Sequence, residues 1–289
     1  MKIGMAGTGR MGAAIAQRLA GRGHQVTVWN RTVDKARALG LPVAEDLSRL
    51  LESSDIIISI LTDAKAIEAV YAKLLAGDVK RKLFIEMSTV RPETQKRLAD
   101  KVRAKGAAFI ECPVGGTVGP AKEGRLFGFA GGEAADVARA RPLLDQMCRR
   151  VEHVGPVGAG AAMKLAINLP LMVFWQSFGE ALSLCEPLGI DPARLMDIFA
   201  DTSGGPNVLK VRGPTIAAAL AGKDAGAATF NVDSMRKDLR TMLEEARALG
   251  RELPVTQRAL ECFDRAARDG LGAADAAMLP ASWLRSQAK

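Results

Sequence analysis

A glycine-rich turn near the first residue limits the fold of this chain more than any other part of its sequence. The segment KIGMAGTGRMGAAIA places Gly7, Gly9 and Gly12 in the spacing G-x-G-x-x-G, after a strand-like stretch and before a helical one. Gly7 permits the tight turn, Gly9 lets backbone approach a pyrophosphate, and Gly12 lets helix pack on strand. The pyrophosphate then lies on the helix N-terminus. The turn, including Thr8 and Arg10, is therefore predicted to bind a dinucleotide.

The hydrophobic pattern divides the chain into two parts. Apolar runs typical of strands alternate with helical spacing up to about residue 160, and only helical patterns follow. This order favours an α/β fold, with an N-terminal doubly wound Rossmann domain over 1–160 and an all-helical C-terminal domain over 161–289. A long interdomain helix is expected over 160–188, with Pro170 kinking it or freeing a carbonyl. The strands are expected at 2–7, 25–30, 54–61, 82–88, 107–114, 126–132 and 151–155.

Composition narrows the function classes. The chain has 289 residues, 48% of them apolar, and no apolar run approaches the roughly 18 residues of a membrane span. Four widely spaced cysteines without a CxxC pair argue against a disulfide frame and a zinc site, so no metal is expected. The start MKIGMAG does not resemble a secretory signal, and we expect a cytoplasmic protein. Only His24 and His153 are present, both in structural contexts, so a general acid must be another residue type.

The net charge of +8 is unevenly distributed. Residues 1–160 hold 25 Lys and Arg against 17 Asp and Glu, whereas residues 161–289 hold 15 of each. The charges of helical segments such as RPETQKRLADKVRAKG are interspersed, as on a solvated amphipathic face. An anionic, phosphorylated cofactor accounts for part of the positive potential. We therefore expect neither nucleic acid nor membrane as a partner.

The end of the second predicted strand indicates which cofactor is bound. An NAD enzyme usually has an acidic residue there to hold the ribose 2′-hydroxyl. This chain has Asn30, Arg31 and Thr32, with no carboxylate before Asp34. Arg31 can pair with a 2′-phosphate, and its two neighbours can add hydrogen bonds. The alternative is an ordinary polar loop, but the pattern favours NADP(H).

A lysine in an apolar helix start is the candidate for acid–base chemistry. In VGPVGAGAAMKLAINLP, Lys164 and Asn168 are four residues apart and share a helix face. A lysine facing a cleft between the domains can donate a proton to a carbonyl oxygen as hydride reaches its carbon, and partial desolvation eases that transfer by lowering the pKa. Taken alone, the pattern fits a snorkelling surface lysine equally well.

Five motifs in order resemble the β-hydroxyacid dehydrogenase family, which includes 3-hydroxyisobutyrate dehydrogenases and glyoxylate/succinic semialdehyde reductases. They cover almost the whole chain, and VTVWNRT, MSTV and RGP look most like the semialdehyde reductase branch. The motifs are GTGRMG at 7–12, MSTV at 87–90, ECPVGGTVGPAKEG at 111–124, GAGAAMKLAIN at 158–168, and the element from Phe230 to Lys237 and Asp238.

The resemblance implies a role for each matching residue. Lys164 falls on the catalytic lysine and Asn168 on the asparagine that orients substrate. Thr89 matches the family threonine that lies beside the nicotinamide and the substrate. Met11 matches the methionine that lines the pyrophosphate turn. Lys237, with Phe230, belongs to an element that closes over the cofactor. Leu61 and Thr62 are also assigned to the cofactor site.

One departure concerns the substrate loop. The family usually has a serine after Pro-Val, where this chain has Gly115. Backbone N–H groups of Gly115 and Gly116, or the Thr117 hydroxyl, are then the candidates for binding a substrate anion. The other interpretation is a pocket for a bulkier or less acidic substrate.

The resemblance implies an oxidoreductase that uses NADPH to reduce a small aldehyde or keto acid, or that oxidises a 3-hydroxyacid in reverse. An imine or bulky-ketone reductase is the alternative enzyme, although Lys164 counts against it. A non-catalytic NADP-binding scaffold is the alternative that is not an enzyme. KLAIN in place of Lys-x-x-His-Asn argues against 6-phosphogluconate dehydrogenase itself. Long apolar helices in a small domain suggest a homodimer or homotetramer.

Overall fold

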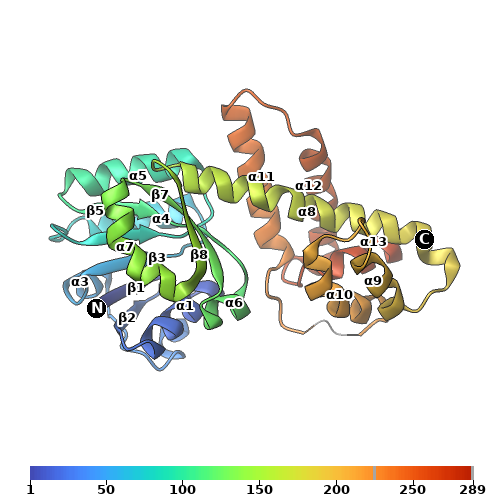
Figure 1. Ribbon diagram of the computed structural model, residues 1–289, viewed down its shortest axis with the longest axis horizontal. Coiled ribbons are helices and arrows are strands. Elements are labelled where there is room, and N and C mark those ends of the chain that lie inside the picture. The colour runs from blue at the N-terminus through green and yellow to red at the C-terminus, as the bar shows by residue number, and fades with distance from the viewer. Residues whose placement is uncertain (224–225, 288–289) are drawn as a thin grey trace. The chain divides into compact units, whose positions relative to one another are not determined.

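The computed structural model describes residues 1–223 and 226–287, which form two compact units, Met1–Leu165 and Ala166–Lys289 (Figure 1). The first unit is built on one sheet and the second on helices. The units meet in sequence inside the helix α8 (Ala159–Cys185), a few residues after the domain boundary predicted at 160/161.

The sheet of the first unit has the strand order β2-β1-β3-β4-β5-β7-β6, with β8 pairing with β7. The first five strands are parallel, and β7 runs antiparallel to β5 and β6. The predicted doubly wound, mainly parallel sheet is therefore confirmed. The strands are β1 (Lys2–Ala6), β2 (Gln25–Trp29), β3 (Ile56–Ser59), β4 (Leu83–Glu86), β5 (Ala108–Glu111), β6 (Val114–Gly115), β7 (Leu126–Gly132) and β8 (Cys148–Gly155).

Two strand predictions differ from the structure. The run expected as one strand over 107–114 is divided into β5 and β6, and Pro113, which has no N–H to donate to a ladder, lies at the break. The last strand begins at Cys148, three residues earlier than predicted, because it pairs with β7 from Leu126 onwards.

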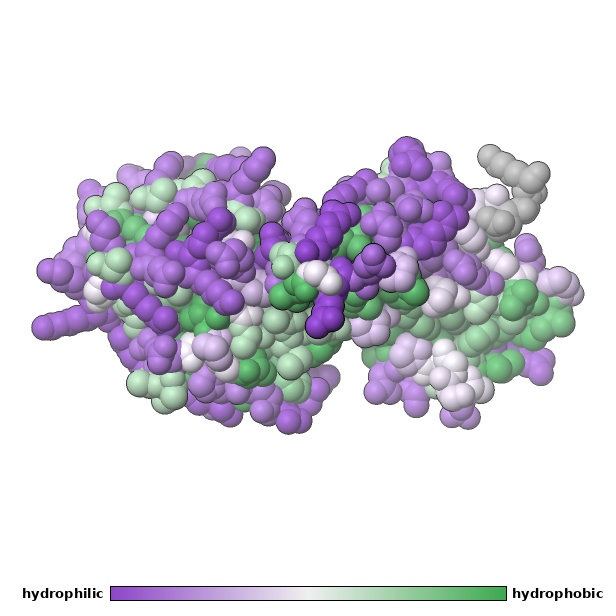
Figure 2. All heavy atoms as spheres, turned by 90° about the horizontal axis from the view of Figure 1, so that it is seen from above, coloured by the Kyte–Doolittle hydropathy of each residue, from purple (hydrophilic) through white to green (hydrophobic). Residues whose placement is uncertain are grey.

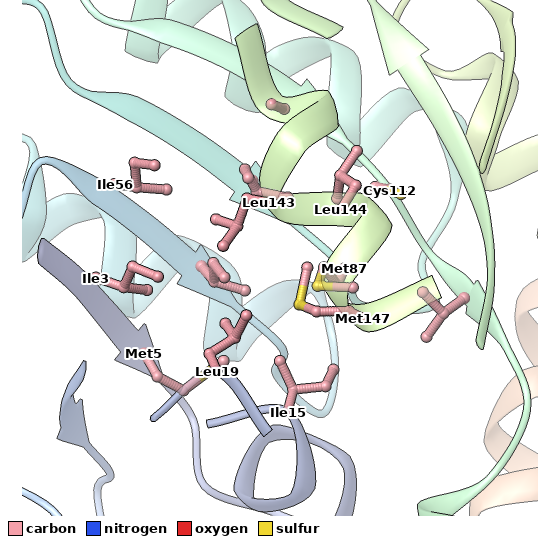
Figure 3. Close-up of a cluster of buried hydrophobic side chains, with 14 of the residues drawn as sticks. Ile3, Met5, Ile15, Leu19, Ile56, Met87, Cys112, Leu143, Leu144 and Met147 are labelled. Carbon is pink, nitrogen blue, oxygen red and sulfur yellow. The ribbon is translucent and has the colours of Figure 1, made fainter. Parts of the chain in front are cut away.

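Helices cover both faces of the sheet. On one face, α1 (Arg10–Gly21) and α7 (Ala134–Met147) pack on the strands, and Figure 3 shows Ile15, Leu19 and Leu143 of these helices in the same apolar cluster as Ile3 of β1. The opposite face is covered by α3 (Leu47–Glu52), α4 (Ala64–Leu74) and α5 (Pro92–Ala104). Continuous apolar strands are buried on both sides in this three-layer arrangement. The short helices α2 (Val33–Arg37) and α6 (Val118–Glu123) complete the unit.

β1 lies between β2 and β3, so the chain leaves the sheet's centre in opposite directions from this strand. Such a reversal leaves a crevice at the carboxyl ends of the two central strands, where open α/β sheets bind their ligands. The glycine turn follows β1 directly and therefore lies at that crevice.

The second unit consists of helices in the part that the structure describes, apart from one isolated bridge between Asn231 and Asp275. Asp191 caps the N-terminus of α9 by accepting hydrogen bonds from two backbone N–H groups, as Asp191-Pro192 predicted. The helix α8 continues through Pro170. The other helices are α9 (Pro192–Ala200), α10 (Asn207–Leu220), α11 (Val232–Ala248), α12 (Pro254–Ala266) and α13 (Met278–Gln287).

The surface is mixed in character. Hydrophilic residues cover much of the first unit in Figure 2, in keeping with the interspersed charges of its helices. Large apolar side chains are exposed on the second unit, among them Leu184, Leu188 and Val211. The homo-oligomer stays a prediction. No helix in the described residues is both long and apolar enough to cross a membrane.

Candidate functional site: a dinucleotide turn and a buried lysine

The three glycines of the turn occupy positions with different requirements. Gly7 has φ +101°, and a Cβ there would lie 2.4 Å from the carbonyl oxygen of Ile60. A Cβ at Gly12 would lie 2.0 Å from the carbonyl oxygen of Gly7, so strand and helix approach too closely for any side chain. Gly9 is the N-cap of α1 and faces open space, and no side chain caps the N–H groups of this helix start. An anion can approach the helix N-terminus at this position.

Asn30 fastens the glycine turn to the end of β2. Its amide oxygen accepts from the backbone N–H of Thr8 at 3.1 Å, and its amide nitrogen donates to the carbonyl of Thr32 at 2.9 Å. These bonds give Asn30 a structural role, and its predicted direct contact with the cofactor stays a prediction. The hydroxyl of Thr8 is buried without a hydrogen-bond partner among the described residues. Because buried hydroxyls normally have a hydrogen-bond partner, this one is a candidate for contacting a ligand at the glycine turn.

Arg31 is exposed at the end of β2, beside exposed Thr32. Within residues 1–223 and 226–287, no hydrogen bond or ion pair involves the Arg31 guanidinium. Asp34, the nearest acid in sequence, pairs instead with Arg37 at 3.5 Å. The group expected to bind a 2′-phosphate therefore keeps all its donors.

A second pair of cofactor candidates follows β3. Leu61 packs its Cδ2 3.0 Å from the position a Cβ would take on Gly7, and its backbone N–H donates to the Ser88 hydroxyl at 2.7 Å. Thr62 is exposed and donates to Asp63, which caps α4. Ser88 directly precedes Thr89, so one hydroxyl ties the loop after β3 to the loop after β4.

Two carboxylates, Glu86 and Glu111, are buried side by side at the carboxyl edge of the sheet, and sequence reasoning did not single them out. They end the adjacent strands β4 and β5 in register, and both are 0% exposed. Glu86 accepts hydrogen bonds from Ser88 and from the Gln95 amide. An acid ending each of two apolar strands, in FIEMS and FIECP, was the available signal.

Glu111 is bound to the first turn of α8. Its Oε1 accepts from the backbone N–H of Gly158 at 2.6 Å and of Gly160 at 2.9 Å. Burial raises the pKa of the Glu111 carboxyl to about 7, the N–H groups of Gly158, Ala161 and Gly160 oppose this rise, and the Glu86 carboxylate adds to it.

In the predicted substrate loop, one glycine position has room for a side chain and the other does not. Gly116 has φ +120°, and a Cβ there would lie 2.8 Å from Leu126. At Gly115 the nearest atom to a Cβ is Cε2 of Phe129 at 3.7 Å, an ordinary contact. A serine would therefore fit at 115. Thr117 is the N-cap of α6, yet its hydroxyl makes no cap hydrogen bond.

Lys164 lies in the first unit, one turn into α8, and Asn168 follows in the second unit on the same helix face. Lys164 is 9% exposed and Asn168 5% exposed. The intervening Ile167 and the preceding Met163 are exposed. A snorkelling surface lysine keeps its charged head in water, and this lysine is buried instead.

Asn168 belongs to a polar cluster of the second unit that includes Asp238, whose role sequence reasoning did not define. The Asp238 carboxylate, 4% exposed, pairs with Lys237 at 2.5 Å and accepts from the Asn168 amide at 3.4 Å. Phe230 is half-buried just before Asn231, which caps α11. The Phe230–Lys237 element is thus joined to Asn168 through one carboxylate.

The remaining metal-ligand and nucleophile types have structural roles. His24 contacts Gln146 at 2.9 Å, and His153 contacts the Gly132 carbonyl at 2.9 Å. All four cysteines are free thiols. The described residues contain no group of three or more His, Cys, Asp or Glu able to hold a metal ion.

Two family models match this chain. Residues 2–155 match the NAD-binding domain of 6-phosphogluconate dehydrogenase, and residues 158–281 match the domain described as NAD-binding of NADP-dependent 3-hydroxyisobutyrate dehydrogenase. The two matches divide the chain where the sheet unit gives way to helices.

Relatives of known activity are similar over nearly their whole length. The 3-hydroxyisobutyrate dehydrogenase of Pseudomonas aeruginosa is 33% identical, with 90% of each chain covered. Glyoxylate/succinic semialdehyde reductase 1 of Arabidopsis thaliana is also 33% identical, over 95% of this chain and 96% of the relative. The structure of Mycobacterium tuberculosis 3-hydroxyisobutyrate dehydrogenase with L-serine is 26% identical in sequence and has a TM-score of 0.85. The match covers 97% of this chain and 98% of the other. By these matches and by the glycine turn and helical unit described above, the chain belongs to the β-hydroxyacid dehydrogenase family, an oxidoreductase family with a nicotinamide cofactor.

Proposed function

We propose that this protein uses NADPH to reduce a small aldehyde or keto acid to the hydroxy acid, or catalyses the reverse oxidation of a 3-hydroxyacid, with Lys164 as general acid and base. The observation that carries the proposal is the burial of Lys164, 9% exposed, in the unit that also holds the dinucleotide turn. An acid–base role for this lysine matches the family to which the chain belongs.

The cofactor half of the proposal rests on the residues at the carboxyl edge of the sheet. Gly9 and the unpaired hydroxyl of Thr8 suit a pyrophosphate on the N-terminus of α1. Arg31, exposed with all its donors available, suits a 2′-phosphate better than a 2′-hydroxyl. Support also comes from the family model for NADP-dependent enzymes that matches residues 158–281. When bound, the nicotinamide supplies or accepts the hydride.

The protein's own residues handle the proton and orient the substrate. As negative charge develops on the carbonyl oxygen, the Lys164 ammonium stabilises it and donates a proton. In the oxidative direction the amine takes the hydroxyl proton. Asn168, one helical turn further along α8, offers an amide to the same substrate, and the Asp238 carboxylate fixes the orientation of that amide. The N–H group of Gly116 and the Thr117 hydroxyl are the donors proposed for a substrate carboxylate, because Gly115, the other predicted donor, is paired with Phe127 in the sheet.

The test replaces Lys164. Lys164→Ala should lower kcat by about 10²–10⁴-fold, the usual contribution of general acid–base catalysis, while the NADPH affinity measured by fluorescence stays near wild type. Lys164→Arg restores the charge but transfers a proton poorly, because a guanidinium hardly deprotonates. Lys73→Ala, which removes an exposed lysine on α4, is the matched control. Retention of more than about a tenth of wild-type kcat by Lys164→Ala would contradict the assignment, and loss of NADPH binding would indicate a cofactor-anchoring role.

A bulky ketone or a cyclic imine is the second candidate substrate, and one observation favours it. Gly115 lies against Phe127 and Phe129, whose stacked rings have centroids 4.9 Å apart. Without a serine hydroxyl, the nearest side chains to position 115 are these two aromatic rings. Purified protein should be assayed with NADPH against glyoxylate, succinic semialdehyde, a bulky ketone and a cyclic imine. Faster turnover of the last two would replace the first proposal.

A further inference from the structure

The carboxylate of Glu111 lies in a space formed by three glycines. Gly131 of β7 is its partner in register, and a Cβ there would lie 2.5 Å from Oε1. Gly158 has φ +101°, and a Cβ on Gly160 would lie 2.3 Å from the carbonyl oxygen of Phe129. A side chain at Gly131 or Gly160 would displace either the carboxylate or the helix, whereas one at Gly158 would meet Lys96. The first turn of α8 therefore packs closely on β7, and the Glu111 carboxylate lies at this contact.

The hydrogen bonds of Glu111 fasten that turn to the sheet. Oε1 accepts from the N–H groups of Gly158 and Gly160, and the N–H of Ala161 also acts to lower the pKa of the carboxyl. These are groups that a helix leaves without intrahelical partners. When the carboxyl is ionised these bonds are charge-assisted, and charge-assisted bonds are stronger than neutral ones. The helix start is held along its axis and against rotation.

Lys164 follows Ala161 by three residues and shares its helix face. Ala161, Lys164 and Leu165 are all buried, so the face that Glu111 holds is the face that carries the lysine. A shift of the first turn therefore moves the Lys164 side chain by a similar amount. A displacement of about 1 Å at a reacting group can lower a rate by about 10²-fold.

We propose that Glu111 is the positioning residue for Lys164: its carboxylate clamps the first turn of α8 to the sheet and so sets the location of the ammonium group. This inference rests on the proposed role of Lys164 as proton donor. Glu111 itself touches neither substrate nor cofactor in the proposal, and its effect passes through the backbone of residues 158–161.

The test separates the clamp from its catalytic consequence. Glu111→Ala removes the acceptor, and we expect amide hydrogen exchange of residues 158–165 to become at least about tenfold faster. The kcat should fall by about 10- to 100-fold, with the KM and the Kd for NADPH within twofold of wild type. Glu111→Gln retains an oxygen at the position of Oε1 that can accept from the N–H groups of Gly158 and Gly160, and its kcat should stay within about threefold of wild type.

Asp46→Ala is the matched control, because Asp46 caps α3 in the same unit by accepting from the backbone N–H of Arg49 at 2.8 Å. It should lose helix-cap stability and keep its kcat. If Glu111→Ala does not fold, Glu111→Asp withdraws the oxygen by one methylene and should show the same changes to a smaller extent.

Wild-type exchange at 158–165 in Glu111→Ala, or in Glu111→Asp when that variant is the one measured, would refute the clamp. Faster exchange with unchanged kcat would refute the positioning role and leave a purely structural cap. An equal fall in Glu111→Gln and Glu111→Ala would also refute it, since the acceptor is restored in only one. Failure of the Lys164 assignment is recognised separately, because Lys164→Ala would then stay active while the exchange measurement still reports on the clamp.

Discussion

Replacement of Arg31 tests the cofactor preference. Arg31→Ala should weaken the binding of NADPH and leave that of NADH nearly unchanged. The structure separates this effect from damage to the fold, because Arg31 is exposed and has no hydrogen bond or ion pair within the described residues. Its removal therefore costs the free protein little, since surface substitutions away from specific contacts usually change stability by less than about 0.5 kcal/mol.

The magnitude follows from the bonds that a guanidinium makes to a phosphate. A charge-assisted hydrogen bond contributes about 1–3 kcal/mol, which corresponds to a roughly 5- to 150-fold change in Kd. We expect the lower part of this range, because an exposed arginine forms its bonds in competition with water. Higher salt should narrow the difference between the two cofactors, since screening weakens exposed charge pairs.

The assay is fluorescence titration of wild type and variant with NADPH and with NADH, together with kcat/KM for each cofactor. Arg37→Ala is the control, because it removes an exposed arginine at the end of the following helix α2, where it pairs with Asp34. A wild-type protein that prefers NADH would refute the reasoning. An Arg31→Ala variant with an unchanged ratio of the two affinities would refute it as well.

Two further predictions concern the substrate loop and the second unit. Gly115→Ser should fit without strain, since the nearest atom to a Cβ at this position is 3.7 Å away. The variant should have a higher kcat/KM for glyoxylate or succinic semialdehyde relative to less acidic carbonyl compounds. An unchanged order of kcat/KM among these substrates would mean that the carboxylate is bound elsewhere. Asp275 is buried and paired with Arg212, and although burial raises its pKa, N–H groups of Ala277 and Thr229 and the guanidinium lower it below the ordinary value. Its stabilisation is therefore complete above the unfolded pKa of about 3.9 and is lost as pH falls through the folded value. Asp275→Asn should lower the free energy of unfolding by about 2–4 kcal/mol near pH 7. The variant should also lose less of that free energy than wild type as the pH falls below about 4. Denaturant titrations at several pH values measure both effects, and the same difference in unfolding free energy between the two proteins at every pH would contradict the prediction.

Much of the fold was predictable because its signals are local. Strand and helix periodicity along residues 2–160, and the loss of strand pattern beyond, are properties of short windows, and they identified the doubly wound sheet and the helical unit. The glycine spacing at 7–12 predicted a turn that requires φ +101° at Gly7 and close packing at Gly12. The Asp191-Pro192 cap was equally local. The division of 107–114 at Pro113 was missed, although proline gave a signal there.

The roles of several site residues depend on partners distant in sequence, which no window contains. Asn30 joins the glycine turn to β2 only because residues 8 and 30 meet in the folded sheet. Glu111 meets the N-terminus of α8 some 47 residues later, and Asp238 meets Asn168 across 70 residues. By itself the sequence determined the glycine turn, the order of the elements and the position of Lys164 on its helix. Only the tertiary structure decided that this lysine is buried and that a carboxylate on a neighbouring strand holds its helix, because burial and hydrogen-bond partners arise when separate elements pack together.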